Sequence, residues 1–406
     1  MSQATDLLGA NPASEKSASH TKVVGVLSAA HFVSHYYILL LAPLLPFVRA
    51  EYNVSYTEIG LALAAFNVVS AALQTPAGFL VDWLGARILL VIGLALGASA
   101  FTIAGIFDSF WLMVAMFALA GVGNTVYHPA DYALLSHHVP PQRIGQAFSI
   151  HTFAGMLGSA VAPATLLLMQ NYWGWRGAFI GAGALGFTVA AILLAVRDFG
   201  PVQVVPPRAD SDKSPVGWRL LLSAPILMNL FFFALLALMS GGMYNYSVVA
   251  LAAIYETPVA VGNFALSGHL LLASIGVLPG GAVATRTLRH GLVASLGLGA
   301  IALLTLLLAE IDLGTLLLIA VMSVCGLFYG FIMPSRDMIV REATPAGSFG
   351  KVFGFVTTGF NIGGIISPLI FGAIMDHGSP RLVFILVAAF GLLSILTVAT
   401  LPRQKA

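Results

Sequence analysis

Long apolar stretches alternate with short polar separators along almost the whole chain. Each stretch is long enough to supply the roughly 20 residues that a helix needs to cross a membrane. Membrane-crossing strands would need only about 10 residues and would alternate strictly between apolar and polar positions. The pattern therefore predicts an all-α membrane protein with twelve transmembrane helices, at 23–48, 57–80, 88–107, 110–136, 144–170, 176–196, 220–250, 258–284, 291–309, 313–340, 351–374 and 381–401.

The composition supports a membrane protein and excludes a soluble enzyme. Of the 406 residues, 59% are hydrophobic and 8% are Asp, Glu, Lys or Arg, whereas a soluble domain carries about 25% charged residues. The net charge of +2 is too small to favour nucleic acid. The single cysteine, Cys325, excludes an intramolecular disulfide. We expect a monomer whose surroundings are the lipid bilayer.

The distribution of Lys and Arg predicts how the chain is oriented. With the N-terminus in the cytoplasm, fourteen of the eighteen Lys and Arg residues fall on the cytoplasmic side and three fall outside. Positive residues gather on the cytoplasmic side of membrane proteins. Both termini are therefore predicted to be cytoplasmic tails (1–22 and 402–406) of a protein in a bacterial inner membrane. The first tail is polar and is not a signal peptide.

The two halves of the chain repeat each other. A shift of 205 residues aligns five Gly or Pro residues with their own kind: Gly121 with Gly326, Pro129 with Pro334, Gly145 with Gly350, Gly158 with Gly363, and Pro163 with Pro368. The repeat predicts two parallel six-helix bundles, 23–196 and 220–401, joined by a polar cytoplasmic linker at 197–219. Parallel repeats with a site between them suit alternating access by rocking.

The loop after the second predicted helix contains Gly78, Asp82, Gly85 and Arg87 in the pattern G-x-x-x-D-x-x-G-x-R. An aspartate at a helix end can pair with a cation or cap a neighbouring helix. The pattern resembles the loop signature of the major facilitator superfamily, and the resemblance covers the chain after the tail. It implies the major facilitator fold and a cytoplasmic latch between the halves, with Asp82 and Arg87 as gating residues. A turn that only sets topology is the structural alternative.

The segment GVGNTVYHPADYALL, which contains His128 and Asp131, resembles the fosmidomycin-resistance group of exporters. This resemblance implies export but leaves the substrate open. The glycine-rich stretch from Gly155 to Pro163 matches an antiporter signature only in part, because the signature's Gly-Pro pair is missing. The direction of transport therefore stays open at this point.

Three ionisable residues, Asp131, Arg336 and Asp337, are predicted to lie at membrane depth. A charge there costs about 2.5–3.5 kcal/mol on insertion scales and so indicates a function. At the offset of 205, Asp131 corresponds to Arg336, in the cytoplasmic third of each half. We predict an intracellular gate in which these three residues and Asp82 pair when the cytoplasmic side is closed. A proton relay through the carboxylates and a permanent salt bridge are the alternatives.

Histidines and neutral polar residues supply the remaining candidates. His31 and His35 share a helix face, and histidine titrates near neutral pH. We predict proton coupling through Asp131, Asp337, His35 and His128, and no metal site, because no carboxylate or Cys accompanies the H-x-x-x-H pair. The cluster Tyr244-Asn245-Tyr246 is predicted to form either an external gate or an interfacial aromatic belt. The substrate-binding candidates are His31, His35, Tyr36, Asn67, Asn124, Tyr127, His151, Tyr244, Asn245, His269, Tyr329 and Asn361. For each of them, a structural contact between helices is the alternative.

The chain has no P-loop, no G-x-S-x-G and no zinc-protease motif, so we predict neither an ATP-driven pump nor an enzyme, and no cofactor. The energy must then come from a gradient, and the intramembrane Asp and His favour protons. We predict a secondary transporter that exports a small organic solute by proton antiport. Proton-coupled uptake (symport) of an organic anion is the alternative, and a non-transporting receptor or scaffold is a more remote one.

Overall fold

The computed structural model describes residues 12–140, 142–196, 218–345 and 349–399, and every regular element in these ranges is a helix. Long apolar stretches form helices in lipid because each backbone N–H and C=O is then satisfied within its own segment. The elements are α1 (Pro12–Ile38), the 3-10 helix η1 (Ala42–Leu44), α2 (Leu45–Tyr52), α3 (Tyr56–Leu84), α4 (Ala86–Ile106), α5 (Phe110–Asn124), α6 (Tyr127–His138), α7 (Ile144–Ala195), α8 (Trp218–Leu221), α9 (Ala224–Tyr255), α10 (Val259–Ala284), α11 (His290–Glu310), α12 (Gly314–Glu342), α13 (Phe349–Asp376) and α14 (Arg381–Ala399).

Eleven continuous helical stretches in the described part are long and apolar enough to cross a membrane. One of them, α7, has 52 residues and contains Gly174 with φ 70° and ψ 170°, which is not a helical conformation. At 1.5 Å per residue α7 would be far longer than a bilayer is thick, so the break at Gly174 divides it into two crossings. The prediction of an all-α protein with twelve crossings is confirmed.

The first helix begins earlier than the sequence predicted. α1 starts at Pro12, so it includes part of the segment that was predicted to be a tail ending at residue 22. Hydropathy marks only where a helix enters lipid, whereas a polar helix can extend beyond that point into water. Proline at the first helical position also suits a helix start. Residues 1–11 of the predicted tail, 197–217 of the predicted linker and the tail at 402–406 lie outside the described residues.

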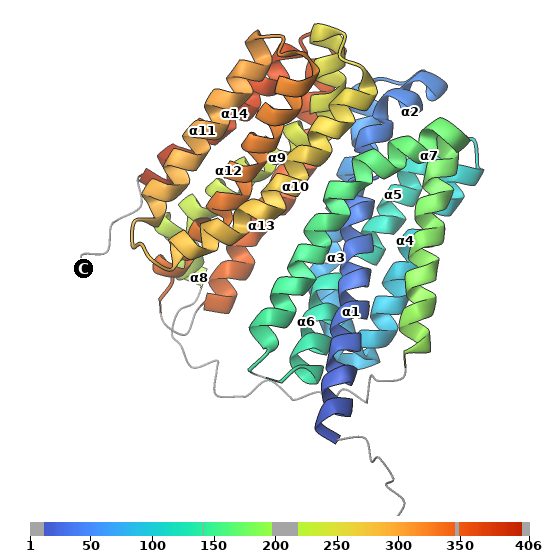
Figure 1. Ribbon diagram of the computed structural model, residues 1–406, viewed down its shortest axis with the longest axis vertical. Helices are drawn as coiled ribbons and strands as arrows, with labels where there is room; N and C mark the ends of the chain where they lie inside the picture. The colour runs from blue at the N-terminus through green and yellow to red at the C-terminus, as the bar shows by residue number, and fades with distance from the viewer. Residues whose placement is uncertain (1–11, 141, 197–217, 346–348, 400–406) are drawn as a thin grey trace, which may run out of the picture.

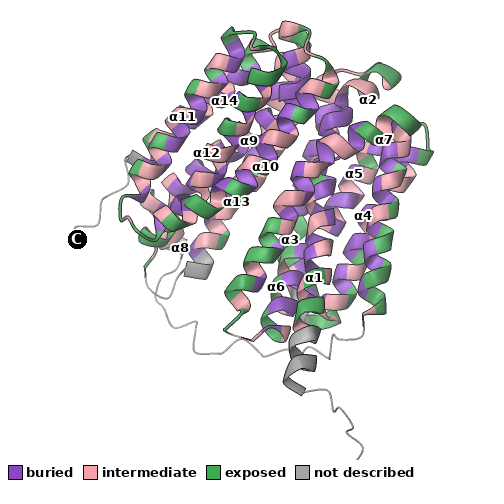
Figure 2. Cartoon of the chain, viewed as in Figure 1, coloured by how far each residue is buried: buried purple, intermediate pink, exposed green. Residues whose placement is uncertain are grey.

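The helices form two bundles that lie side by side (Figure 1). The N-terminal bundle contains α1 and α3–α7, and the C-terminal bundle contains α9–α14. Buried positions face the interior of each bundle, while exposed positions lie mainly on the outside (Figure 2). The exposed set includes large apolar side chains such as Leu316 and Leu278, which lipid accommodates without cost.

The two bundles meet most closely at one end of the molecule. Contacts between them come mainly from α3 with α13 and from α7 with α10. Near the start of α3, a Cβ added at Gly60 would lie 2.7 Å from the Pro368 carbonyl oxygen of α13. Toward the other ends of the same two helices, Gly78 and Gly354 have no described atom within 4 Å of such a Cβ. We call the end with Gly60 and Pro368 the contact end and the opposite one the far end.

Candidate functional site

Four histidines from three helices gather inside the N-terminal bundle. The His31 ring of α1 stacks on the His151 ring of α7 at a centroid distance of 4.0 Å. The rings of His35 and His128 lie 4.6 and 5.6 Å from His31. Two hydrogen bonds orient the rings on α1, because His31 Nδ1 lies 2.9 Å from the His151 carbonyl oxygen and His35 Nδ1 lies 3.3 Å from Ser159 Oγ.

Asp131 lies beside this group and is completely buried. It comes from α6, which is separate from α5, and Pro129 cannot donate the backbone bond that would join the two helices. The Asp131 Oδ2 atom is 3.4 Å from Nε2 of His151, whose side chain is also buried. Neither carboxylate oxygen accepts a hydrogen bond from a described residue. His151 is thus the ionisable partner of the buried carboxylate, and we call Asp131 with the four histidines the Asp–His cluster.

A glycine makes room for two of these rings. A Cβ added at Gly155 of α7 would lie 2.6 Å from His31 Cε1 and 3.0 Å from His35 Cδ2. A Cβ atom this close would force its neighbour to move. That neighbour is the His31 ring, which cannot move freely because it is stacked on the His151 ring. Gly155 is therefore part of the support for the cluster, a role that the motif comparison did not indicate.

The equivalent region of the C-terminal bundle contains a cation among aromatic rings. Arg336 of α12 pairs with the adjacent Asp337, with Nη2 2.8 Å from Oδ1. Its guanidinium lies 5.0 Å from the Phe233 ring centre and 5.4 Å from the Phe360 ring centre. Arg336 is 8% exposed, so the carboxylate and the ring faces together replace its water.

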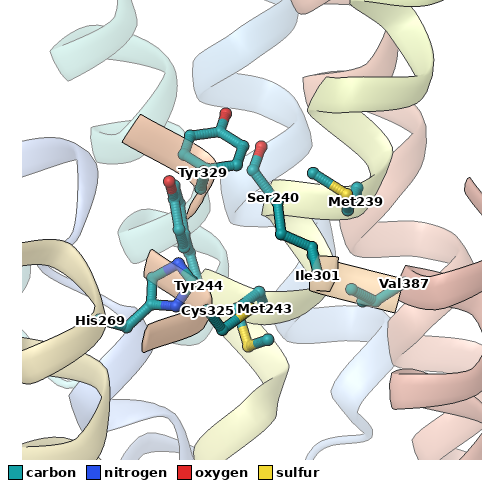
Figure 3. A pocket seen from close by; sticks show the side chains of 9 residues that line it. All are labelled: Met239, Ser240, Met243, Tyr244, His269, Ile301, Cys325, Tyr329 and Val387. Carbon is teal, nitrogen blue, oxygen red and sulfur yellow. The ribbon is translucent and has the colours of Figure 1, made fainter. Parts of the chain in front are cut away.

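A second polar group lies deeper in the C-terminal bundle, where Tyr244, His269 and Tyr329 border a cavity of ≈ 10 Å³, about the room of one water molecule. The three rings lie on one side of this cavity in Figure 3, with Met239 and Val387 on the other. The Tyr244 ring centre is 5.7 Å from that of His269 and 6.1 Å from that of Tyr329. His269 Nδ1 donates to the Met322 carbonyl oxygen at 3.0 Å.

Most of the other predicted substrate contacts lie within a single bundle. Tyr36 OH bonds to Thr165 Oγ1 at 2.9 Å, and Asn124 Nδ2 lies 3.4 Å from Ser70 Oγ. Asn245 donates to a carbonyl of its own helix, and Tyr127 is buried. These contacts agree with structural roles, so a substrate role for these residues stays a prediction.

Asn67 is placed between the bundles, because a Cβ added at Gly364 of α13 would lie 2.9 Å from its Oδ1. His128 and Tyr132 of α6 are exposed, the latter by 48%. Asn361 of α13 is half-buried. Of these side chains, Asn67 is the one that a contact places between the bundles.

The predicted gate concerns the closed state of the far end, whereas the bundles lie apart at that end in this structure. Asp131 contacts His151 and Arg336 contacts Asp337, each within its own bundle. Arg87 donates to the carbonyl oxygens of Leu193, Leu194 and Val196 at the end of α7, and the side chain of Asp82 lies outside the described ones. A gate that joins the bundles through these residues therefore requires another arrangement of the bundles and stays a prediction.

Tyr246 does not belong to an interfacial aromatic belt. It is completely buried, and its hydroxyl donates to the Pro368 carbonyl oxygen at 2.7 Å. Its ring centre lies 6.0 Å from that of Phe371 of α13, and a Cβ added at Gly60 of α3 would lie 3.2 Å from its hydroxyl, so it is covered by both bundles. The belt alternative is thus wrong for Tyr246.

Comparison with known proteins decides the family. The model of the Major Facilitator Superfamily matches residues 27–257 and 230–406, which together cover nearly the whole chain. The chain belongs to the Major Facilitator Superfamily. A solved structure of the nucleoside transporter NupG shares the superfamily fold with a TM-score of 0.73 at 15% identity, over 95% of this chain and 100% of that one. A bacterial homologue of the lysosomal transporter Spinster matches with a TM-score of 0.74 at 13% identity, over 98% of this chain and 100% of that one.

Curated relatives within the superfamily include resistance proteins. The fosmidomycin resistance protein of Escherichia coli (strain K12) is 24% identical over 98% of this chain and 97% of its own. The multidrug resistance protein MdtH of Salmonella arizonae is 24% identical over 83% of each chain. The resemblance to the fosmidomycin-resistance group is confirmed. As a superfamily member, the chain is a multi-pass protein of a bacterial inner membrane that transports a small molecule rather than catalysing a reaction.

Proposed function

We propose that this transporter exports a small organic solute in exchange for protons, and that Asp131 and His151 carry the exchanged proton. The buried Asp131–His151 contact is the observation that supports this proposal. A charge without water or a full set of hydrogen bonds is costly inside a protein. A carboxylate and an imidazole in contact are two groups between which a proton can move, which makes the pair suited to bind a proton and release it again.

The histidines provide a route between this pair and the surface of the N-terminal bundle. His128 is exposed, and its ring centre is 5.6 Å from that of His31. His31 stacks on His151, which contacts Asp131. This succession of imidazoles leads from the buried carboxylate to an exposed side chain.

The names of two relatives support export as the direction of transport. Two resistance proteins resemble this chain over 83% or more of its length, and resistance to a drug is a usual consequence of its export. Fosmidomycin is therefore the first solute to test. With the cytoplasmic orientation that the Lys and Arg distribution predicts, the far end of the bundles faces the cytoplasm, where an exporter collects its solute.

Flux in inverted membrane vesicles tests the proposal. Export in exchange for protons predicts that an acidic lumen drives accumulation of labelled fosmidomycin, and that collapsing the pH gradient stops it. Vesicles with Asp131→Asn protein should lose the gradient-driven part of the flux. Asp108→Asn is a suitable control, because Asp108 is an exposed carboxylate outside the Asp–His cluster.

Two outcomes would contradict the proposal. If an acidic lumen drives the solute out of the vesicles, the transporter is a symporter, as the uptake alternative requires. If flux does not respond to pH gradients at all, the Asp–His cluster has no coupling role. A thermal-shift panel of antibiotics and organic anions should be run first, because a ligand that binds the native state raises its apparent stability.

A further inference from the structure

One acidic side chain crosses from one bundle to the other at the contact end. Asp376, the last residue of α13, accepts hydrogen bonds from the backbone N–H groups of Tyr56 and Thr57 at 2.7 and 2.8 Å. The Thr57 hydroxyl donates to the same carboxylate at 2.6 Å. Because α13 belongs to the C-terminal bundle and α3 to the N-terminal one, these three bonds join the two halves of the transporter.

The bonds satisfy groups that α3 cannot satisfy itself. The first N–H groups of a helix have no partner within it, and the helix N-terminus carries a partial positive charge. Ser55 and Glu58 form a capping box, in which the Ser55 hydroxyl accepts from the Glu58 N–H. The N–H groups of Tyr56 and Thr57 remain outside that box, and the Asp376 carboxylate accepts from both.

The backbones of the two helices approach closely around this contact. A Cβ added at Gly372, one turn before Asp376, would lie 2.9 Å from Thr57 Cα, and Gly60 faces Pro368 equally closely. Glycines thus allow α3 and α13 to touch where the carboxylate reaches the helix terminus. The contact holds in this arrangement and has to break whenever the bundles separate at this end.

We propose that Asp376 is the latch of the contact end: its carboxylate, bound to the N-terminus of α3, selects the conformation in which this end is shut. Alternating access requires the two ends to open in turn, and the rocking bundles act as a two-state system. An interaction present in one state alone changes the ratio of the two states by its own free energy. The proposal depends on transport by rocking bundles but not on the coupled ion, so it stands whether or not protons are exchanged.

Distances between spin labels at both ends test the latch. The sole cysteine, Cys325, is buried and is replaced in a Cys325→Ala background. Trp111→Cys with Leu316→Cys reports the contact end, because these exposed residues lie near the starts of α5 and α12. Ile88→Cys with Leu292→Cys reports the far end, near the starts of α4 and α11. Both label pairs are placed in full-length protein in lipid nanodiscs.

Asp376→Ala should lengthen the contact-end distance and shorten the far-end distance in a larger share of molecules. The expected change in the ratio of the two states is about fivefold, the size of effect that loss of a helix cap produces. Asp376→Asn, which keeps one carbonyl oxygen as an acceptor, should give a smaller change. Thr57→Val removes the hydroxyl but keeps the backbone N–H, so it should also give a smaller change, whereas Thr57→Ser should match the wild type.

Asp108→Ala is the matched control. Asp108 is also a carboxylate at the contact end, but its ionic partner, Arg176, belongs to the same bundle, so its loss should leave both distances unchanged. The latch is refuted if Asp376→Ala gives the wild-type distributions at both ends while its thermal unfolding is also unchanged. It is equally refuted if Asp108→Ala produces the same shift. If Asp376→Ala lowers the unfolding temperature without shifting the ratio of states, Asp376 is a structural cap and not a latch.

Discussion

In the N-terminal bundle the residue at position 131 is a carboxylate among imidazoles, whereas its equivalent in the C-terminal bundle, Arg336, is a guanidinium among aromatic rings. Asp131 is completely buried and contacts a residue that can itself gain or lose a proton. Arg336 has a carboxylate on the next residue and two phenylalanine rings nearby. The two bundles share one arrangement of helices, but at the equivalent position one has an acidic residue beside histidines and the other a basic residue beside aromatic rings.

This difference separates two ways of keeping a charge inside a membrane protein. An arginine stays charged at every accessible pH, so the protein has to supply a permanent counter-charge. An aspartate beside a histidine can instead alternate between a charged and a neutral pair. The N-terminal bundle is thus suited to follow the proton gradient, and the C-terminal bundle to hold a fixed charge. Each prediction below tests one side of this contrast.

The largest effect is expected for Asp131→Asn, which resembles the protonated carboxyl in shape and cannot ionise. Transport driven by a pH gradient should fall to the background, while exchange of labelled for unlabelled solute across the membrane should continue. Both fluxes can be measured in the same proteoliposomes. Stability should change little, since the substitution removes a buried charge and leaves the volume unchanged.

The result would count against the contrast if Asp131→Asn protein still accumulated solute along a pH gradient. The contrast would also fail if the folded Asp131→Asn protein lost both the exchange of labelled for unlabelled solute and the pH-driven accumulation of solute. In that case Asp131 would be needed for the movement of the bundles and not for coupling alone.

The next largest effect is expected for Asp337→Asn, and here it concerns stability. The substitution leaves Arg336 nearly buried without its carboxylate. Breaking a fully buried pair costs about 3–5 kcal/mol, but Asp337 is 44% exposed, and solvent reduces the loss to about 1–3 kcal/mol. Thermal unfolding in detergent should show the decrease, and adding Arg336→Gln should restore part of it, as a double-mutant cycle would report. A purely additive double mutant would mean that the two side chains do not stabilise each other.

Gly155→Ala tests the support of the Asp–His cluster. The added methyl group would press on His31 and His35, and overpacking of this kind costs about 1–3 kcal/mol. We expect weaker pH-driven transport together with a lower unfolding temperature. Gly145→Ala is the matched control on the same helix, since no described atom lies within 4 Å of its added Cβ. Equal behaviour of the two variants would show that the histidine rings can move without consequence.

The sequence was enough to predict the fold, because the length and apolar character of each crossing are local properties. It was less informative about helix ends that extend beyond the membrane: α1 begins at Pro12, whereas the apolar stretch begins only at residue 23. The Asp–His cluster was foreseeable only as separate residues: His31, His128 and His151 come from three helices, and their meeting depends on how each helix is rotated about its axis. None of these three helices has a pronounced apolar stripe, so the sequence does not indicate that rotation.

The predicted pairing of charges at the far end stays a prediction, because it concerns the closed state of that end. Asp131 and Arg336 are equivalent in the repeat, so they lie at similar depth in their own bundles. Similar depth does not mean that the two side chains touch. The Asp376 latch was missed for a related reason: its partners are backbone N–H groups of a distant helix, and no side-chain pattern in the sequence marks them.

The smallest effects are expected at a pair of arginines that the repeat also relates. Arg176, near the break of α7, bonds to Glu51 at 2.8 Å and to Asp108 at 2.6 Å. Its counterpart Arg381 donates to a backbone carbonyl oxygen at 2.6 Å and lies 3.9 Å from Glu310.

Ion pairs exposed to solvent contribute about 0–1 kcal/mol each. Arg176→Ala, which loses two carboxylate partners, should therefore lower the free energy of unfolding by about 1–2 kcal/mol, and Arg381→Ala by less than about 1 kcal/mol. The difference between the two variants should shrink in high salt, which screens exposed charges. Both arginines donate to a backbone carbonyl oxygen, Arg176 to that of Phe107. If Arg381→Ala proves the more costly of the two, the ion pairs of Arg176 do not stabilise the N-terminal bundle, and the number of ion pairs does not explain how the bundles differ at this end.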